Sequence, residues 1–369
     1  MQPIIDLNEF RSVGVESTRI PAVIGDRKIR FGLVGCGRIS YKHIEAFQAH
    51  HEFAELTAVC DNAPDALRAA AQATGATAYS RYDDLLKDGS IDAVVLATPS
   101  GLHAEQGVAA AAVGKHVVTE KPMATRWRDG LRLVKACDEA GVRLFVVKQN
   151  RRNATLQFLK RAIEQKRFGR IFMVNLNVFW NRPQSYYDSA AWRGTWEFDG
   201  GAFMNQASHY VDLLDWLVGP VQSVHAFTAT LARDIEVEDT GVANIRWRSG
   251  ALGSINVTML THKQNFEGSL TIIGEKGTVR VGGVAVNQIQ HWEFEDVRPE
   301  DQLVANASYE TTSVYGHGHP EYYRNVIESL RGEALPETDG REGLRSLELL
   351  IGIYLSARDN RVVSLPLNY

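Results

Sequence analysis

Short apolar runs alternate with helical patterns over the first 150 residues. The segments 31–34, 91–97 and 142–147 are nearly continuous apolar runs, as expected for strands that are buried on both faces. Between them the chain favours helices, for example over 64–74 and 126–140, and a glycine follows each of these two. This alternation predicts a doubly wound, mostly parallel α/β sheet of the Rossmann type, in which ligands bind beyond the carboxyl ends of the strands.

From about residue 151 the pattern changes to alternating apolar and polar positions. Segments such as 171–180 and 221–230 are typical of antiparallel strands with one covered face. We therefore expect a C-terminal α+β domain with a large, mainly antiparallel open sheet, residues 151–369, for substrate binding and oligomerisation. Residues 28–150 form the expected dinucleotide-binding domain, and residues 1–27 an N-terminal extension.

The composition excludes several classes of protein. The 369 residues carry a formal net charge of −4 and no dense basic run, so nucleic acid is not expected as a partner. No apolar run approaches the length of a membrane span and the N-terminus does not resemble a signal peptide, so no membrane partner is expected. Cys36, Cys60 and Cys137 lie at no metal-ligand spacing, which favours packed thiols in a reducing cytoplasm and no metal.

The first predicted strand runs into a glycine turn. Gly35-Cys36-Gly37 is followed by a helical pattern from Ile39, and a turn of this kind brings backbone N–H groups up to a pyrophosphate. Ser40 occupies the third position of the Gly-x-Gly-x-x-Gly motif. About twenty residues further on, Asp61 ends a second strand, where its carboxylate can accept from the ribose hydroxyls and repel a 2′-phosphate. The turn predicts NAD as cofactor; the alternative is a turn that serves only helix–sheet packing.

Later strands also end in polar segments. Lys121 stands in Glu120-Lys121-Pro122, and the proline keeps it out of the helical region. We expect the Lys121 ammonium near the nicotinamide, where it would polarise an oxygen and help to carry a proton. The alternative is a solvated loop lysine. His103, which follows Thr98-Pro99, either lines the cofactor pocket or only closes its turn.

A second polar cluster lies on a helix predicted from Asp199, as the N-cap, to Gly219-Pro220. Asn205, His209 and Asp212 share one face, opposite an apolar face, which suits the wall of a cleft. Asp212 could orient His209 as a general acid/base. The alternative is a surface helix with an incidental His–Asp pair.

Two loops carry further candidates. The segment 192–196 combines Trp192 and Arg193, which suits a sugar or an anion, or alternatively a packed loop. His317 and His319 are two residues apart and cannot share a helix face, so 315–320 is interpreted as a flexible loop near the cleft.

With these motifs in place, the sequence resembles the glucose–fructose oxidoreductase / inositol dehydrogenase (Gfo/Idh/MocA) family from Arg30 to the C-terminus. The resemblance implies hydride transfer at a sugar carbinol, with Lys121 and His209 as catalytic residues and a cis Lys121–Pro122 peptide. Asn205 departs from the family pattern, since many members have an aspartate there. The cofactor contacts implied are Gly35, Gly37, Arg38, Ile39, Asp61, Thr98, Pro99, His103, Glu120, Lys121 and Gln149.

Within the family, the segments 148–152, 192–196 and 204–206 are most similar to a bacterial nucleotide-sugar branch. Its members are usually homotetramers that oxidise the 3-hydroxyl of UDP-N-acetylglucosaminuronic acid (UDP-GlcNAcA) for lipopolysaccharide biosynthesis and regenerate bound NAD with 2-oxoglutarate. A free-sugar or inositol dehydrogenase, and a non-catalytic NAD-binding regulator, remain the alternatives. The substrate contacts implied are Lys121, Arg152, Trp192, Arg193, Asn205, Gln206 and His209, with Arg182 as a further cation.

Overall fold

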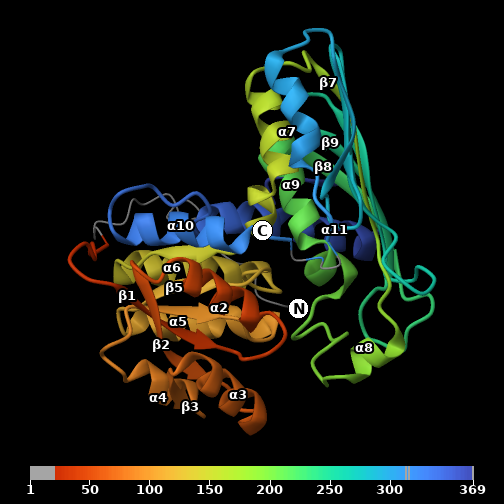
Figure 1. The fold of residues 1–369 in the computed structure, drawn as a ribbon. Coiled ribbons are helices and arrows are strands. Elements are labelled where there is room, and N and C mark those ends of the chain that lie inside the picture. The colour runs from red at the N-terminus through yellow and green to blue at the C-terminus, as the bar shows by residue number, and fades with distance from the viewer. Residues whose placement is uncertain (1–20, 312–313, 315, 368–369) are drawn as a thin grey trace. The chain divides into compact units, whose positions relative to one another are not determined.

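The structure is a computed structural model that describes residues 21–311, 314 and 316–367. The chain folds into two compact units (Figure 1). Of the described residues, the first unit holds 21–147 together with His319–Leu347, and the second holds Lys148–Gly318 together with 348–367. Residues 319–347 thus belong to the first unit, whereas the sequence pattern had placed them in the second domain. Most of the expected extension, 1–20, lies outside the described residues.

The first unit contains a six-stranded, fully parallel sheet in the order β3-β2-β1-β4-β5-β6. The strand order reverses between β1 and β4, so a ligand site is expected outside the carboxyl ends of these two strands. The predicted Rossmann fold is confirmed, although the short β3 was not predicted. The strands are β1 Ile29–Val34, β2 Ala54–Cys60, β3 Thr77–Tyr79, β4 Ala93–Leu96, β5 His116–Thr119 and β6 Leu144–Val146.

A helix from late in the chain completes the core of this unit. Tyr323 of α10 lies against the rings of Phe31 and Phe47, with ring centroids 6.1 and 4.9 Å away. All three side chains are buried, so α10 covers apolar surface of β1 and α2. The helices of the unit are α2 Ser40–Ala49, α3 Pro64–Thr74, α4 Tyr82–Leu86, α5 His103–Ala112, α6 Trp127–Ala140 and α10 His319–Leu330, with the first turns of α11 Gly340–Asp359.

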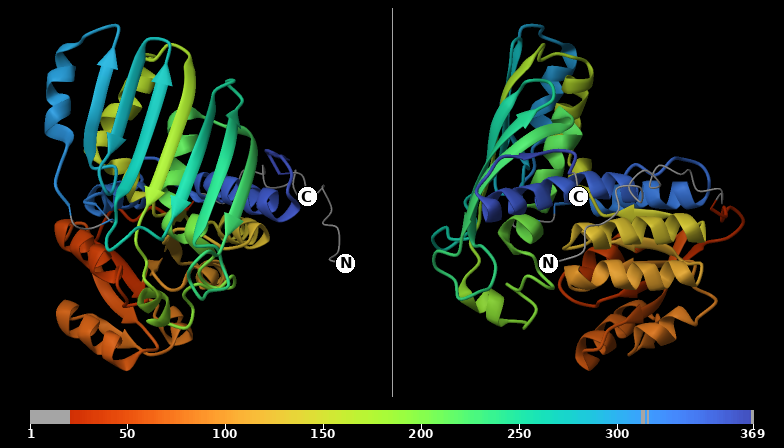
Figure 2. Two further views of the ribbon diagram at one scale, coloured as in Figure 1. Left: turned by 90° about the vertical axis from the view of Figure 1, so that its right-hand side faces the viewer. Right: turned by 180° about the vertical axis from the view of Figure 1, so that it is seen from behind.

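The second unit is built on an eight-stranded sheet in the order β13-β12-β11-β7-β10-β9-β8-β14. Only β7 and β10 pair in parallel, so the expected mainly antiparallel sheet is confirmed. Helices α7 and α9 lie on one face (Figure 2). The elements are α7 Ala154–Glu164, β7 Ile171–Phe179, α8 Gln184–Asp188, α9 Ser208–Val218, β8 Val221–Ala229, β9 Thr240–Trp247, β10 Leu252–Thr258, β11 Glu267–Gly274, β12 Gly277–Gly282, β13 Gln288–Phe294 and β14 Val363–Ser364.

The other face of this sheet carries apolar side chains. Phe227 and Val242 are opposite one another on β8 and β9, and they are 55% and 44% exposed. Met173 and Leu252, which are opposite one another on β7 and β10, are also exposed. Within the described part of the chain, no helix is both long and apolar enough to cross a membrane.

Candidate active site

The glycine turn is shaped for close approach of a ligand. Gly35 has a φ of +94°, and a Cβ there would lie 2.6 Å from the backbone oxygen of Ala97. Gly37 is exposed, and a Cβ on it would meet nothing within 4 Å. Ser40 stands where the Gly-x-Gly-x-x-Gly motif has its third glycine. Its hydroxyl donates to the Gly37 carbonyl and so contributes a hydrogen bond to the turn. The open backbone before α2 fits the pyrophosphate of NAD.

Asp61 holds this turn against the end of β2. Its carboxylate accepts from the backbone N–H of Cys36 at 2.7 Å and from that of Ala63 at 2.8 Å. Each oxygen keeps a further lone pair for a ribose hydroxyl. The expected cofactor residues at this edge are exposed or half-buried, namely Gly37, Arg38, Ile39, Asp61, Thr98, Pro99 and Lys121, while Gly35 is buried beneath them.

His103 and Glu120 are placed differently from the other expected cofactor residues. His103 is 1% exposed, and its two ring nitrogens lie 2.8 Å from the carbonyl oxygens of Thr98 and Pro122. His103 therefore links the loops that follow β4 and β5. This is the role of closing its turn, the second of the two alternatives considered for it. Glu120 is 6% exposed and accepts from the backbone N–H of Lys121. Both side chains are therefore buried under the residues that line this edge. The Lys121–Pro122 peptide is cis, as the resemblance implied.

In the second unit, His209 and Gln149 lie side by side. His209 Nε2 is 3.0 Å from Gln149 Nε2, and the two residues are 8% and 1% exposed. An amide that donates to Nε2 stabilises the unprotonated nitrogen, which is the state a general base needs. Gln149 was expected to bind the cofactor; the structure places it against the imidazole.

Asp212 has partners other than the expected His209. Its carboxylate forms two 2.8 Å hydrogen bonds with Arg151 and lies 3.2 Å from Lys148 Nζ. Burial by itself would raise the pKa of Asp212, but the two cations outweigh burial and hold the pKa well below its ordinary value. This buried ion cluster ties α9 to the segment that carries Gln149.

The segment before α9 is not a regular helix. A π-helical turn covers Ala202–Gln206, and α9 begins only at Ser208. The predicted N-cap is wrong, because Asp199 instead accepts from the backbone N–H of Gly194 and contacts the Asn205 amide. Asn205 and Gln206 therefore project from a π turn, a feature often found at functional sites.

Glu238 and Tyr354 hold the start of this π turn. Glu238 Oε1 accepts from the Phe203 N–H at 2.8 Å and lies 2.8 Å from the Tyr354 hydroxyl. That hydroxyl also lies 2.5 Å from the Gly200 carbonyl. The single hydrogen of the Tyr354 hydroxyl cannot be donated to both the Gly200 carbonyl and Glu238. A protonated Glu238, which can itself donate to that hydroxyl, therefore fits these distances best. Burial accordingly raises the pKa of Glu238 to about 7.

A Glu238→Gln variant is expected to be more stable than the parent at pH 8 but not at pH 5. The pKa of Glu238 rises from 4.5 to about 7 on folding, so its stabilisation is present at low pH and is lost as the pH rises through 7. Glutamine cannot ionise, and the gain at pH 8 should reach roughly 3 kcal/mol. Urea unfolding at both pH values measures it. An equal difference at both values would contradict a protonated Glu238.

Two arginines meet around Tyr186, which the sequence did not single out. Arg193 Nη1 donates to the Tyr186 hydroxyl at 2.6 Å, and Gln206 Nε2 lies 3.0 Å from the same oxygen. Arg182 donates to Gln206 Oε1 at 3.0 Å. Among the described residues, no carboxylate pairs with Arg193, whose guanidinium lies over the rings of Tyr186 and Trp192. We name Arg182, Tyr186, Arg193 and Gln206 the arginine–tyrosine cluster; its charge suits an anionic ligand.

The remaining candidates have less distinctive settings. Arg152 is half-buried at the end of a short 3-10 helix, Gln149–Arg152. His319 contradicts the flexible-loop interpretation, because it begins α10 and is fully buried. Tyr315 of that segment lies outside the described residues. The helical spacing of apolar residues could have predicted α10 from the sequence. Its buried face carries Tyr322, Tyr323, Val326 and Leu330.

Comparisons with known proteins identify the family. The family model described as "Oxidoreductase family, NAD-binding Rossmann fold" matches residues 29–148, and "Oxidoreductase family, C-terminal alpha/beta domain" matches residues 160–365. D-apiose dehydrogenase of Paraburkholderia graminis is 26% identical, over 92% of this chain and 90% of that protein.

Two solved structures are much more similar. The WlbA dehydrogenase from Bordetella pertussis, in complex with NADH and UDP-GlcNAcA, is 70% identical with a TM-score of 0.91, covering 94% of this chain and 100% of that one. The WlbA dehydrogenase from Chromobacterium violaceum, in complex with the same two ligands, is 66% identical with a TM-score of 0.91, covering 95% and 100%. The chain therefore belongs to the Gfo/Idh/MocA oxidoreductase family and is an NAD-dependent dehydrogenase.

Proposed function

We propose that the chain oxidises the 3-hydroxyl of UDP-GlcNAcA to the 3-keto sugar with NAD as acceptor. Support comes from the two WlbA dehydrogenases, which were solved with NADH and UDP-GlcNAcA. The observation in this chain that carries the proposal is the arginine–tyrosine cluster. A UDP-linked uronate has a carboxylate and a diphosphate, and guanidinium groups bind both kinds of anion in a bidentate manner.

In the proposed reaction, His209 and Lys121 act on the same hydroxyl. A substrate hydroxyl that replaces the Gln149 amide at His209 Nε2 can pass its proton to that nitrogen. The Lys121 ammonium polarises the oxygen and stabilises its developing negative charge. Bound NAD supplies the acceptor for the hydride. Asp61, a carboxylate at the end of β2, favours NAD over the 2′-phosphorylated cofactor.

For substrate binding, we propose contacts from Arg152, Trp192, Arg193, Asn205 and Gln206. Arg193 and Gln206 belong to the arginine–tyrosine cluster, and the neighbouring indole of Trp192 offers a face for a sugar or a uracil ring. Asn205, held by Asp199, would donate to a sugar hydroxyl rather than act as an acid.

The substrate and the oxidised carbon are tested together by isotope transfer. UDP-GlcNAcA deuterated only at C3 should transfer its deuterium to NAD, and UDP-GlcNAcA deuterated only at C4 should transfer none. UDP-N-acetylglucosamine, myo-inositol and glucose serve as competitors for specificity. Turnover of inositol or glucose alone would establish the free-sugar alternative. NAD binding without turnover of any of them would establish the regulator.

We further propose a homotetramer in a reducing cytoplasm, acting in lipopolysaccharide sugar synthesis and using 2-oxoglutarate to regenerate NAD. The exposed Phe227 and Val242 on the open sheet face support association through that face. Burial raises the pKa of the Cys36 and Cys137 thiols to about 12, which suits unreactive, reduced cysteines. Light scattering tests the oligomeric state. Recovery of NAD on adding 2-oxoglutarate to the reduced enzyme tests the regeneration step.

A further inference from the structure

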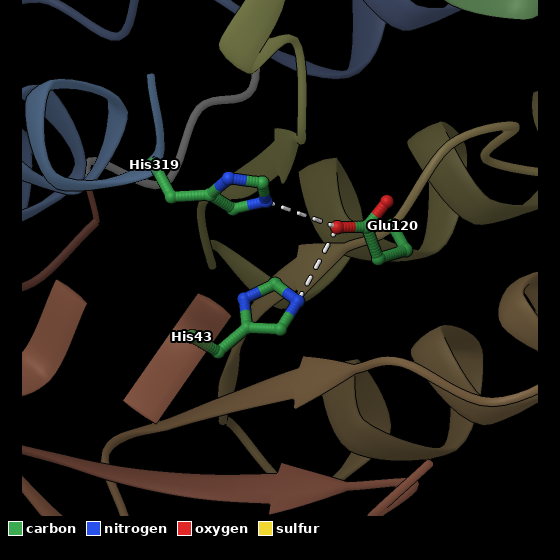
Figure 3. A group of neighbouring side chains, drawn as sticks. All are labelled: His43, Glu120 and His319. Carbon is green, nitrogen blue, oxygen red and sulfur yellow. Dashed lines mark ion pairs between the residues drawn. The ribbon is translucent and has the colours of Figure 1, made fainter. Parts of the chain in front are cut away.

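Three buried side chains of the first unit meet in Figure 3, and one of them, Glu120, accepts from the backbone N–H of Lys121. They are His43 of α2, Glu120 after β5 and His319 at the start of α10, with exposures of 0%, 6% and 0%. Glu120 Oε1 lies 3.3 Å from His43 Nε2 and 3.8 Å from His319 Nε2. Residues from three distant parts of the chain therefore face one carboxylate oxygen.

The second oxygen of this carboxylate contacts the proposed catalytic lysine. Glu120 Oε2 accepts from the Lys121 N–H at 3.2 Å. The carbonyl of the following residue, Pro122, lies 2.8 Å from His103 Nδ1. The main chain that carries the Lys121 side chain is thus held on both sides, and the position of Glu120 determines one of the two contacts.

The buried carboxylate of Glu120 requires a cationic partner. Burial alone would raise the pKa of Glu120, but His319 and His43 more than offset burial, so the pKa lies well below its ordinary value. An ionised carboxylate at this depth is costly unless a positive charge contacts it.

His43 is the nearer of the two imidazoles to this carboxylate. Its Nε2 is the closer to Glu120, and its Nδ1 lies 2.8 Å from the Tyr323 hydroxyl, which can donate or accept. His319 is farther away, and burial lowers its pKa, which favours the neutral ring.

Two histidines and a carboxylate are also ligands that Zn²⁺ uses, so a metal is the competing occupant. Tetrahedral bonds of about 2.0–2.1 Å place donor atoms about 3.3–3.4 Å apart, whereas the His319–Glu120 separation is 3.8 Å. One carboxylate would also leave a divalent ion with a net buried charge of +1, while one proton leaves the group neutral.

We propose that His43, Glu120 and His319 hold one additional proton between them as a charge-sharing triad that positions the Lys121 backbone for catalysis. His43, Glu120 and His319 are positioning residues, and their role rests on the proposed function of Lys121. The other titratable groups that act on the triad are Lys42 of α2, His103 of α5, and Tyr322 and Tyr323 of α10.

The charge on the two imidazoles of the triad is measured by NMR of the full-length protein labelled with ¹⁵N-histidine. Signals are assigned with His43→Gln and His319→Gln, and His51→Gln, an exposed histidine in the turn after α2, is the matched control. At about pH 7.5 we expect imidazolium shifts at both nitrogens of one of the two rings, His43 or His319, and neutral shifts for the other. In Glu120→Gln both rings should be neutral. Two neutral rings in the parent protein, or one equivalent of bound zinc by elemental analysis, overturn the proposal.

The positioning role is measured by kinetics on the same variants. Glu120→Ala should lower kcat about 10- to 100-fold with little change in KM for NAD, because a displaced lysine affects the chemical step. Glu120→Gln keeps an oxygen for the Lys121 N–H and should recover part of the loss; it also serves if the alanine variant does not fold. An unchanged kcat, or a Glu120→Gln variant as slow as Glu120→Ala, contradicts positioning. If the parent enzyme does not oxidise UDP-GlcNAcA, the proposed function fails, while the NMR result still decides whether the triad holds the additional proton.

Discussion

His209→Ala is expected to lower kcat/KM for UDP-GlcNAcA by about 10³-fold, and Lys121→Ala by a similar factor. Each change removes a group that handles the proton or the charge on the reacting oxygen, and such groups contribute roughly 10²- to 10⁴-fold. The affinity for NAD should change little in His209→Ala, since the glycine turn and Asp61 belong to the other unit. Steady-state NADH formation measures kcat/KM for UDP-GlcNAcA. Calorimetric titration with NAD measures the affinity for NAD.

The double variant distinguishes joint action from separate roles. Residues that act on one oxygen as a pair have strongly non-additive effects, so Lys121→Ala/His209→Ala should be only slightly slower than the slower single variant. His291→Ala provides a histidine control, because this residue is exposed on β13. If either single variant retains activity within about threefold of the parent, its assigned role is wrong.

Asp212→Asn is expected to lower the free energy of unfolding by about 3–5 kcal/mol. The substitution leaves Arg151 and Lys148, both buried, without this carboxylate, and breaking a buried ion pair from one side costs about that much. Urea unfolding at neutral pH measures the change. Asp65→Asn is the control, because Asp65 is 95% exposed in its pair with Arg68, and its effect should stay within about 0.5 kcal/mol.

The contribution of Asp212 also has a defined pH dependence. The pKa of Asp212 is depressed on folding, so the stabilisation is fully present above the ordinary pKa of an aspartate and is lost as the pH falls toward the folded value. The difference between parent and Asp212→Asn should therefore shrink on acidification below about pH 4. A difference that does not change with pH would mean that packing, not charge, accounts for it.

The cofactor half of the fold could be predicted because its signals are local. The strand, the Gly35-Cys36-Gly37 turn and the following helix occupy one short stretch, and Asp61 follows the next strand. Buried parallel strands are continuous apolar runs, so their ends, and with them Thr98 and Lys121, could be located from sequence. The mainly antiparallel sheet was likewise visible in its alternation.

What could not be predicted depends on contacts between distant segments. Asp212 lies three residues from His209 on α9, yet its ion partners are Arg151 and Lys148, sixty-odd positions earlier. The His43–Glu120–His319 triad has no spacing that a motif could reveal. The π turn over Ala202–Gln206 also lacks a local signal, because Glu238 and Tyr354 hold it from elsewhere in the sequence.

The insertion of α10 into the first unit has a consequence for engineering. Residues 29–148, taken alone as a module for nicotinamide chemistry, would lack the helix that buries Phe31 and Phe47, and would also lack His319. This fragment would therefore expose the apolar surface that α10 covers in the intact protein, and it would tend to aggregate. A chimaera in which the cofactor domain is replaced by that of a relative must therefore exchange two segments of the chain. Residues 319–347 have to be replaced together with the N-terminal segment of the first unit.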